Sequence, residues 1–368
     1  MNDTESMLLL GIGTAGAKIA RGVRRAFGEG LRVALADTDA TTGQDGDNFT
    51  LLGGDRLSGH GAGGDIVAAR LAAEDSIQTL DPHLEGVRLV VIVTALGGGT
   101  GGGATLEAVK HLASLGLPSV VFATTPFFFE GDTRQANARS IAPLIEEAAN
   151  ATFFMPLDKL VIGEDNMDAA MQRAVDAMAS GITLFWRLVE RGGYIRLDAD
   201  RIRRLVANAG RGRFATVTVQ GPSRAADAVD RLIRSELLAT ASAPVNAILC
   251  GVLAGDDLRL SEIATISDGI REAFGNNLTF DLGTVNDEET FSGRLSVVVM
   301  LFETSRRAPG ASVGGVLGSQ PSARRGGKGV LGVGPVGRGR FDKVEPTIWH
   351  DEDLDVPTFI RKNVNLDF

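Results

Sequence analysis

The sequence predicts an α/β protein with a parallel sheet in its first half and a smaller α+β domain in its second half. Apolar, β-branched runs alternate with helix-length segments between residues 8 and 125, a pattern typical of parallel sheets covered by helices. Two of these runs end in glycine clusters, as expected where a strand leads through a loop into a helix. Between residues 214 and 303 strand-like runs enclose helices in a different order, which indicates a second domain.

The first half supplies the elements of the predicted parallel sheet. Short apolar runs place strands at residues 8–10, 31–36, 87–93 and 118–123, each too short for a helix of ordinary length. The intervening segments place helices at residues 17–27, 67–80 and 105–115. Residues 41–65 are polar and glycine-rich, so we expect them to be mostly loop.

A long helix is expected next, because apolar side chains recur at steps of three and four residues and form one stripe. The stripe consists of Met167, Met171, Ala174, Met178, Ile182, Phe185 and Val189. We interpret it as core, and Gly192-Gly193 as the end of the helix. The second domain follows, with strands at residues 216–219, 245–253 and 295–302 and a helix at residues 225–237.

The end of the chain has a different composition. From Thr304 to about Val344 it is rich in Gly, Ser, Pro and Arg, which predicts a flexible linker. Apolar side chains return between acidic and basic residues at positions 351–362, the form of a partner-docking segment; a frayed tail is the alternative. The predicted divisions are therefore 1–163, 164–191 (central helix), 192–303 (α+β domain), 304–350 (linker) and 351–368 (terminal peptide).

Composition excludes several classes of protein. The net charge of −9 over 368 residues argues against broad nucleic-acid binding. A single cysteine, Cys250, excludes a disulfide framework and argues against a cysteine-based metal site. The N-terminus has no signal-peptide pattern, and no apolar run approaches 18 residues, so we expect a cytoplasmic protein without direct membrane insertion.

The two glycine clusters, Gly11–Gly16 and Gly97–Gly103, carry the functional prediction. Each follows a predicted strand and precedes a predicted helix. Glycine lets backbone N–H groups approach phosphate oxygens, and a helix N-terminus adds partial positive charge. Two such clusters in one sheet predict a polyphosphate ligand that is held from two sides.

The first cluster alone leaves other ligands open. Gly11, Gly13 and Gly16 fit GxGxxG, and Asp37 ends the second strand, as in dinucleotide-binding proteins. The P-loop pattern GxxxxGK[ST] fails, because an alanine stands directly before Lys18. The second cluster favours a triphosphate, because a dehydrogenase has no need of it; a dinucleotide-dependent dehydrogenase remains the alternative.

The second cluster also carries a resemblance. Its sequence GGGTGGG is similar to the GGGTGTG signature of the tubulin/FtsZ family, with Gly102 in place of threonine. Further segments resemble motifs of this family in the same order along the chain: Gly11–Lys18, Asp37–Ala40, Gly59–Gly64, Thr125–Gly131 with Arg134, Pro156–Leu160, Ala254–Leu260 and Asp355–Lys362. This shared order over nearly the whole chain is more specific than any one motif.

The resemblance implies a tubulin/FtsZ fold and a GTPase that binds GTP or GDP with Mg²⁺ and polymerises head to tail for cell division, in the cytoplasm at the division site. The implied nucleotide-binding residues are Gly11, Gly13, Thr14, Ala15, Gly16, Ala17, Lys18, Asp39, Gly61, Ala62, Gly63, Gly64, Gly97, Gly98, Gly99, Thr100, Gly101, Gly102, Glu130, Arg134, Val175 and Asp176. Residues 14–18 and 99–101 would hold the phosphates, and residues 61–64 would sense the γ-phosphate. Glu130 and Arg134 would contact ribose and phosphate, although an ordinary i, i+4 helix pair is the alternative. Lys18, where the family has asparagine, either adds charge near the phosphates or simply extends from a helix.

The resemblance also implies partners. The chain would bind further copies of itself. The terminal peptide would dock on division proteins or membrane tethers through Asp355, Val356, Pro357, Phe359, Ile360 and Arg361.

The chain departs from the family in its catalytic loop. The family carries NxDxxD in a loop that enters the next subunit's nucleotide site, but here Arg196 replaces the asparagine and Arg201 the second aspartate. Asp198 stays in place, and Asp200 stands one residue short, a rotation of roughly 100° on a helix. With Asp198 and Asp200 as the catalytic carboxylates, we expect slow hydrolysis. The arginines could instead stabilise the transition state, or form surface ion pairs with Asp198 and Asp200.

Base recognition is altered as well. The family's Asn-Asp on the central helix is Val175-Asp176 here, its stacking phenylalanine is Met171, and the asparagine of PNDKL is Leu157. Asp176 could still accept hydrogen bonds from guanine. A scaffold that binds nucleotide without hydrolysing it is the alternative function.

Overall fold

The computed structural model describes residues 7–28, 30–160, 166–190, 193–197, 199–207, 209–239, 244–303, 348–349 and 352–353. The chain divides after Gly314 into two units. In the second unit the described part is one short antiparallel ladder of β11 (Ile348–Trp349) and β12 (Glu352–Asp353). The rest of the predicted linker and terminal peptide lies outside the described residues. No helix within the described ranges is both long and apolar enough to cross a membrane.

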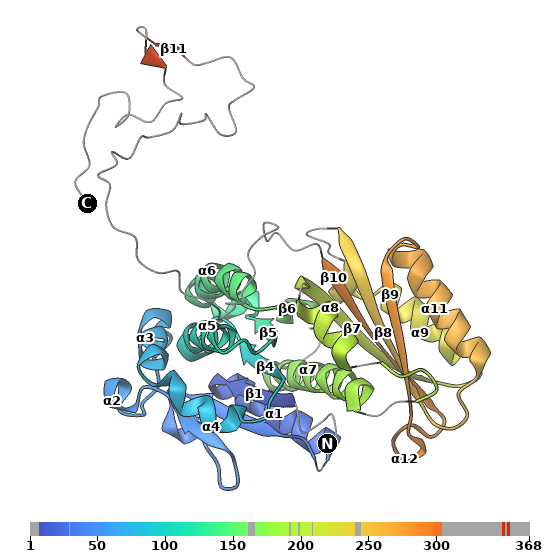
Figure 1. The fold of residues 1–368 in the computed structure, drawn as a ribbon, viewed down its shortest axis with the longest axis horizontal. Coiled ribbons are helices and arrows are strands. Elements are labelled where there is room, and N and C mark those ends of the chain that lie inside the picture. Colours follow the sequence, from blue (N-terminus) through green and yellow to red (C-terminus); the bar gives the residue numbers. More distant parts are fainter. Residues whose placement is uncertain are drawn as a thin grey trace, which may run out of the picture. The chain divides into compact units, whose positions relative to one another are not determined.

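The first half of the large unit is a parallel sheet, as predicted (Figure 1). Its strands are β1 (Met7–Ile12), β2 (Val33–Asp37), β3 (Phe49–Leu51), β4 (Leu89–Ala95), β5 (Ser119–Thr125) and β6 (Ala151–Pro156). Their order is β3-β2-β1-β4-β5-β6, so the direction of strand succession reverses between β1 and β4. In open α/β sheets, ligands bind at the carboxyl ends of the strands beside such a switch point.

Helices cover both faces of this sheet. One face packs on α1 (Gly13–Phe27) and α7 (Met167–Glu190), and the other on α3 (Ile66–Ser76), α5 (Gly99–Ser114) and α6 (Asp132–Ala148). Strand side chains alternate between the two cores: Leu9 belongs to the first, and Leu8 and Leu10 to the second. The apolar stripe on α7 is core from Ala174 to Val189, as the sequence predicts, with Met178 and Ile182 fully buried. The prediction is wrong for Met171, whose side chain is 40% exposed.

The second half continues the same sheet. β10 (Arg294–Glu303) lies antiparallel between β7 (Gly210–Gln220) and β8 (Val245–Ala254), and β9 (Thr279–Asn286) pairs in parallel with β8. β7 joins β6 through three residue pairs, Ala151–Gly210 to Phe153–Gly212. α9 (Arg224–Ile233) and α11 (Leu260–Phe274) lie together on one face of these strands, as Figure 1 shows, while α7 packs on the other.

Short helices make up most of the connections. They are η2 (Ala40–Thr42), α2 (Gly54–Leu57), η3 (Ile77–Leu80), α4 (Asp81–Leu84), η4 (Phe128–Glu130), η5 (Leu157–Lys159), α8 (Ala199–Ala207), α10 (Glu236–Ala239) and α12 (Glu288–Phe291). Residues 41–65, expected to be mostly loop, also contain the edge strand β3 and α2.

Both helices that follow the glycine clusters begin earlier than the sequence predicts. α1 begins at Gly13 rather than residue 17, and α5 at Gly99 rather than residue 105. Glycine has a low helix propensity, but here it allows close packing. A Cβ on Gly99 would lie 2.6 Å from the carbonyl oxygen of Asp65, and one on Gly101 would overlap that of Ala95. Much of the second cluster is therefore packed helix, not loop.

Candidate functional site

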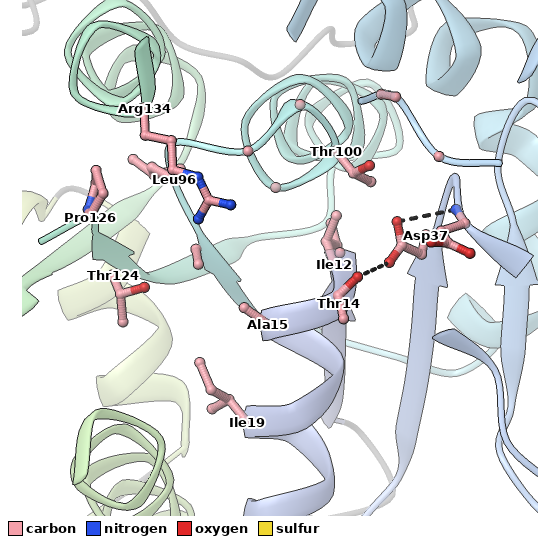
Figure 2. Close-up of a pocket in the computed structure, with 18 of the residues that line it drawn as sticks. Ile12, Thr14, Ala15, Ile19, Asp37, Leu96, Thr100, Thr124, Pro126 and Arg134 are labelled. Atoms are coloured by element: carbon pink, nitrogen blue, oxygen red, sulfur yellow. Dashed lines mark hydrogen bonds between the residues drawn. The ribbon is translucent and has the colours of Figure 1, made fainter. Parts of the chain in front are cut away.

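A cavity of about 410 Å³ lies at the carboxyl ends of β1, β2, β4 and β5 (Figure 2). It is therefore beside the switch point between β1 and β4. Its volume falls within the roughly 300–1,000 Å³ of ordinary ligand pockets. The lining residues are Ile12, Gly13, Thr14, Ala15, Ile19, Asp37, Asp39, His60, Gly61, Ala62, Gly63, Ala95, Leu96, Gly98, Gly99, Thr100, Gly101, Thr124, Pro126, Glu130, Arg134, Leu157, Met171, Ala174 and Val175.

The two glycine clusters meet in this cavity. The Thr94 hydroxyl lies 3.1 Å from the carbonyl oxygen of Ile12 and 2.9 Å from that of Gly101, and so connects the two segments. Gly13 has a φ of +76°, which favours glycine, and a Cβ there would lie 3.3 Å from the Gly101 nitrogen. The N-termini of α1 and α5 thus open on one space, where their partial positive charges favour an anion.

Side chains from η4 and α6 lie beside the second glycine cluster. The Arg134 guanidinium donates to Glu130 Oε2 at 2.5 Å, and Glu130 Oε1 accepts from the backbone N–H of Phe127 at 2.9 Å. The pair is thus an i, i+4 contact that also faces the cavity. Asn137 donates to the carbonyl oxygens of Gly64 (2.9 Å) and Gly97 (3.1 Å), and so connects the glycine-rich segment Gly59–Gly64 to the second cluster.

A buried carboxylate organises the opposite side. Asp37 is 1% exposed. Its Oδ2 accepts from the hydroxyls of Thr14 (3.1 Å) and Thr42 (2.7 Å), and its Oδ1 from the backbone N–H of Thr38 (2.7 Å). The hydroxyls of Thr38 and Thr100 lie 2.7 Å apart, which links this segment to the start of α5.

A second acidic residue, Asp39, also lines the cavity. Its carboxylate accepts from the hydroxyl (2.7 Å) and the backbone N–H (2.8 Å) of Thr41. These hydrogen bonds, with a smaller contribution from nearby His60, lower the pKa of Asp39. Asp39 therefore carries its negative charge over a wide pH range.

The other end of the cavity is mostly apolar. Ile19 of α1 faces Met171, Ala174 and Val175 of α7, with Leu157 beside them. The structure does not bring Asp176 into this space. Its carboxylate accepts from Gln172 Nε2 at 2.8 Å and lines a separate cavity of about 560 Å³ between α1, α7 and the second half of the sheet.

Most of the predicted binding residues line the cavity, and the rest have other positions. Those outside the lining are Gly11, Gly16, Ala17, Lys18, Gly64, Gly97, Gly102 and Asp176. Gly16 is packed against β4, where a Cβ would overlap the Val93 carbonyl oxygen, and Gly102 lies against Ile141. Lys18 is exposed on α1.

Several lining residues were not predicted. Ile12, Ala95 and Thr124 stand at the ends of strands, and their position at the edge of a parallel sheet is a signal that sequence could have given. His60 lies within the glycine-rich segment Gly59–Gly64. Ile19 and Ala174 had no sequence signal beyond their place on apolar helix faces.

The predicted catalytic loop is described only in part. Asp198 lies outside the described residues, as does the terminal peptide Asp355–Lys362. Asp200 belongs to α8, but its side chain is outside the description. Arg201 of α8 forms an ion pair with Asp281 of β9.

The preceding segment is held on β9 by one hydrogen bond to a side chain and one between backbone groups. The Ile195 N–H donates to the Thr284 hydroxyl (2.9 Å), and the Thr284 N–H to the Ile195 carbonyl (2.8 Å). The next side chain, Arg196, is exposed. The backbone at Ile195 is thus anchored on β9, while the Arg196 side chain faces solvent.

Comparison with known proteins agrees with this geometry. Residues 6–162 match the model of the Tubulin/FtsZ family, GTPase domain, and residues 210–303 that of the FtsZ family, C-terminal domain. The chain is 28% identical to the cell division protein FtsZ of Pseudomonas aeruginosa over 292 residues, 78% of this chain and 74% of that protein. FtsZ of Azotobacter vinelandii is 28% identical over 287 residues, 76% of this chain and 73% of the relative.

Solved structures share the fold. An empty FtsZ dimer from M. jannaschii superposes with a TM-score of 0.76 at 22% identity, over 86% of this chain and 95% of that one. CetZ2 of Haloferax volcanii, solved as a GTPγS-bound protofilament, gives a TM-score of 0.71 at 21% identity, over 82% and 94%. The predicted fold class is therefore confirmed, and the first half of the sheet is a GTPase domain rather than a dehydrogenase domain. The chain belongs to the tubulin/FtsZ family.

Proposed function

We propose that this chain binds GTP with Mg²⁺ in the described cavity and polymerises head to tail into filaments for cell division, in the cytoplasm at the division site. The observation that carries the proposal is the convergence of Gly13–Ala15 and Gly98–Gly101 on one cavity. Two helix N-termini and glycine backbone suit a polyphosphate better than any singly charged ligand. The protofilament form of CetZ2 and the dimer form of the M. jannaschii FtsZ support the assembly part.

The lining residues divide into a phosphate end and a base end. The starts of α1 and α5 offer backbone N–H groups to the phosphates, and Arg134 adds a fixed cation. Glu130, beside Arg134, can accept from ribose hydroxyls. The apolar wall of Ile19 and Val175 suits the flat faces of a purine.

The phosphate end also fits Mg²⁺. Asp37, Asp39 and the hydroxyls of Thr14 and Thr100 offer oxygen atoms, and Mg²⁺ is usually held by phosphate oxygens with one or two protein ligands. The described residues contain no cluster of three or more His, Cys, Asp or Glu that would hold a metal by itself, so binding here depends on the nucleotide. When bound, Mg²⁺ neutralises charge that develops on the phosphates.

Hydrolysis is expected to be slow. We infer that Asp198 and Asp200 reach the nucleotide of the next subunit and orient the attacking water. Arg196 and Arg201 stand where the family has an asparagine and an aspartate. These two replacements support slow turnover, because phosphoryl transfer depends on the placement of charge. The ion pair of Arg201 with Asp281 adds support, because it holds a cation at the position where the family has a carboxylate.

The terminal peptide supplies the contacts with other proteins in this proposal. Asp355, Val356, Pro357, Phe359, Ile360 and Arg361 combine apolar and charged side chains after a long polar linker. Such a segment is suited to dock on a division protein or a membrane tether.

One experiment tests the main proposal. Purified protein is sedimented with GTP and Mg²⁺, and phosphate release is measured in parallel. We expect pelletable polymer and slow phosphate release; rapid release without polymer would contradict both parts. Polymer without any release would instead favour the nucleotide-stabilised scaffold.

A further inference from the structure

The Thr14 hydroxyl has an unusual position at the phosphate end of the cavity. Thr14 is in the first turn of α1 and lines the cavity, while its Oγ1 donates to Asp37 Oδ2 at 3.1 Å (Figure 2). A threonine hydroxyl has one proton and two lone pairs. The direction of this hydrogen bond therefore decides what Thr14 can offer to a ligand.

The surroundings of Asp37 fix that direction. An ionised carboxylate only accepts hydrogen bonds. Asp37 is surrounded by donors: the hydroxyls of Thr14 and Thr42 on Oδ2, and the backbone N–H groups of Thr38 (2.7 Å) and Asp39 (3.4 Å) on Oδ1. Thr14 Oγ1 also lies 3.2 Å from Thr42 Oγ1, but the Thr42 hydroxyl donates its own proton to Asp37 at 2.7 Å. Burial of Asp37 favours donation to its charge, and with its proton on Asp37 the Thr14 hydroxyl keeps its lone pairs for the cavity.

A hydroxyl in this state suits a cation and not a phosphate. A phosphate oxygen needs a donor, and Thr14 has no second proton to give. Thr100, on the opposite side, differs in its partner: its hydroxyl lies 2.7 Å from that of Thr38, which can both donate and accept, whereas Thr14 donates to a carboxylate. A carboxylate partner holds the proton of Thr14, while the partner of Thr100 leaves its direction open.

We propose that Thr14 Oγ1 is a ligand of the Mg²⁺ that accompanies the nucleotide, with Asp37 as the positioning residue that turns its lone pairs toward the metal. This rests on the proposed function, since the metal enters with GTP. Neutral oxygen ligands are ordinary for Mg²⁺, and a hydroxyl at the start of a helix holds Mg²⁺ in the P-loop proteins.

The test compares GTP affinity in saturating Mg²⁺ with that in EDTA, by equilibrium titration of the full chain. Thr14→Val removes the oxygen and keeps the shape, and Thr14→Ser restores the oxygen. Thr42→Val is the matched control, because its hydroxyl contacts both Asp37 Oδ2 (2.7 Å) and Thr14 Oγ1 (3.2 Å) but belongs to a residue that does not line the cavity. Thermal melts verify that each variant is folded.

We expect Thr14→Val to weaken GTP binding about tenfold in Mg²⁺ and to leave binding in EDTA unchanged. Thr14→Ser and Thr42→Val should keep the increase in GTP affinity that Mg²⁺ gives to the natural chain. Equal loss in Mg²⁺ and in EDTA would overturn the proposal, because the hydroxyl would then donate to phosphate. Unchanged binding by Thr14→Val in both conditions would overturn it too. Absence of GTP binding by the natural chain would instead overturn the proposed function itself.

A second measurement does not depend on affinity. With Mn²⁺ in place of Mg²⁺, water-proton relaxation of the protein–Mn²⁺–GTP complex reports how many waters the metal keeps. Thr14→Val should gain metal-bound water relative to Thr42→Val, because water replaces the lost hydroxyl. Equal hydration of the two variants would contradict direct ligation.

Discussion

Arg201 of α8 forms an ion pair with Asp281 of β9, and the two partners differ sharply in exposure. The Arg201 side chain is 56% exposed, but that of Asp281 is 6% exposed. Among the described residues, Arg201 is the charge partner of this buried carboxylate. We therefore expect a change at Arg201 to affect the stability of the second half of the sheet as well as the predicted catalytic loop.

This relationship shapes a test of slow hydrolysis. Arg201→Asp returns a carboxylate to the position where the family has one, and we expect faster phosphate release. In the natural background it also faces the carboxylate of Asp281, at an expected cost of roughly 1–2 kcal/mol in unfolding free energy, since half of the pair is exposed. Urea denaturation measures that cost.

The double variant Arg201→Asp with Asp281→Asn separates the two effects. It should recover most of the stability and release phosphate faster, per polymerised subunit, than Asp281→Asn alone. An unchanged or lower rate in a stable double variant would count against the explanation by a misplaced carboxylate.

Gly101 and Gly98 should respond differently to alanine. A Cβ on Gly101 would overlap the Ala95 carbonyl oxygen, whereas one on Gly98 meets nothing within 4 Å. We expect Gly101→Ala to lower the unfolding free energy by at least about 2 kcal/mol. Gly98→Ala should cost less than about 1 kcal/mol and still weaken GTP binding, because the methyl group projects into space that the phosphates would use. Thermal melts and nucleotide titration measure the two responses. Equal destabilisation by both changes would refute the distinction.

Arg134 should contribute directly to nucleotide affinity. Hydrogen bonds to charged groups are typically worth about 1.5–3 kcal/mol, and Arg134 is partly exposed, so Arg134→Ala should weaken GTP binding about tenfold. The GTP affinity of Arg134→Lys should fall between those of the natural chain and Arg134→Ala, because lysine keeps the charge but lacks the planar guanidinium. Arg139→Ala on the same helix, an exposed residue outside the cavity lining, is the control. An equal effect of Arg139→Ala would indicate a general charge effect.

Glu262 links stability to pH. Its hydrogen bonds from the buried Arg224 (2.7 and 3.0 Å) lower its pKa in the folded chain. A lowered pKa stabilises the fold above the unfolded value of 4.5, and this contribution is lost as the pH falls through the folded value. Glu262→Gln should thus cost about 1–3 kcal/mol at pH 7, with the difference from the natural chain shrinking below about pH 4.5.

The matched control for Glu262 is Asp230→Asn, which removes an exposed pair with Arg234. Denaturation at a series of pH values should show little change for Asp230→Asn at any pH. A constant deficit for Glu262→Gln down to pH 3 would mean that the ion pair is not the source of its stability.

The sequence was sufficient for β1, β2, β4 and β5 of the parallel sheet, though not for β3 and β6, and for the meeting of the two glycine clusters. Uninterrupted apolar runs such as Leu89–Val93 leave little alternative to a buried strand. It failed where local and tertiary preferences disagree. α6 contains Pro143, which normally interrupts a helix. β9 contains Asp281 and Gly283, two residue types that strands disfavour. The tertiary structure requires the glycine, because a Cβ on Gly283 would collide with Leu197.

The site was predicted more completely in its backbone than in its side chains. Glycine spacing identified the phosphate end because it reflects local backbone geometry. The contacts of Asp37 with Thr14 and Thr42 span 23 and 5 residues and depend on how α1 meets η2, which no periodicity records. The position of Asp176 was missed for the same reason. The sequence predicted its helix, but not which of the two cavities the Asp176 side chain would line.

The packed glycines at the start of α5 affect how inactivating mutations there should be interpreted. Gly99, Gly101 and Gly103 have backbone oxygens of other segments where a methyl group would stand. Inactivating alleles at these codons are therefore expected whether or not the residue approaches GTP. A mutational screen would therefore score Gly99, Gly101 and Gly103 as equally intolerant of substitution. A variant that stays folded, as expected for Gly98→Ala, is needed to separate loss of contact with the nucleotide from loss of packing.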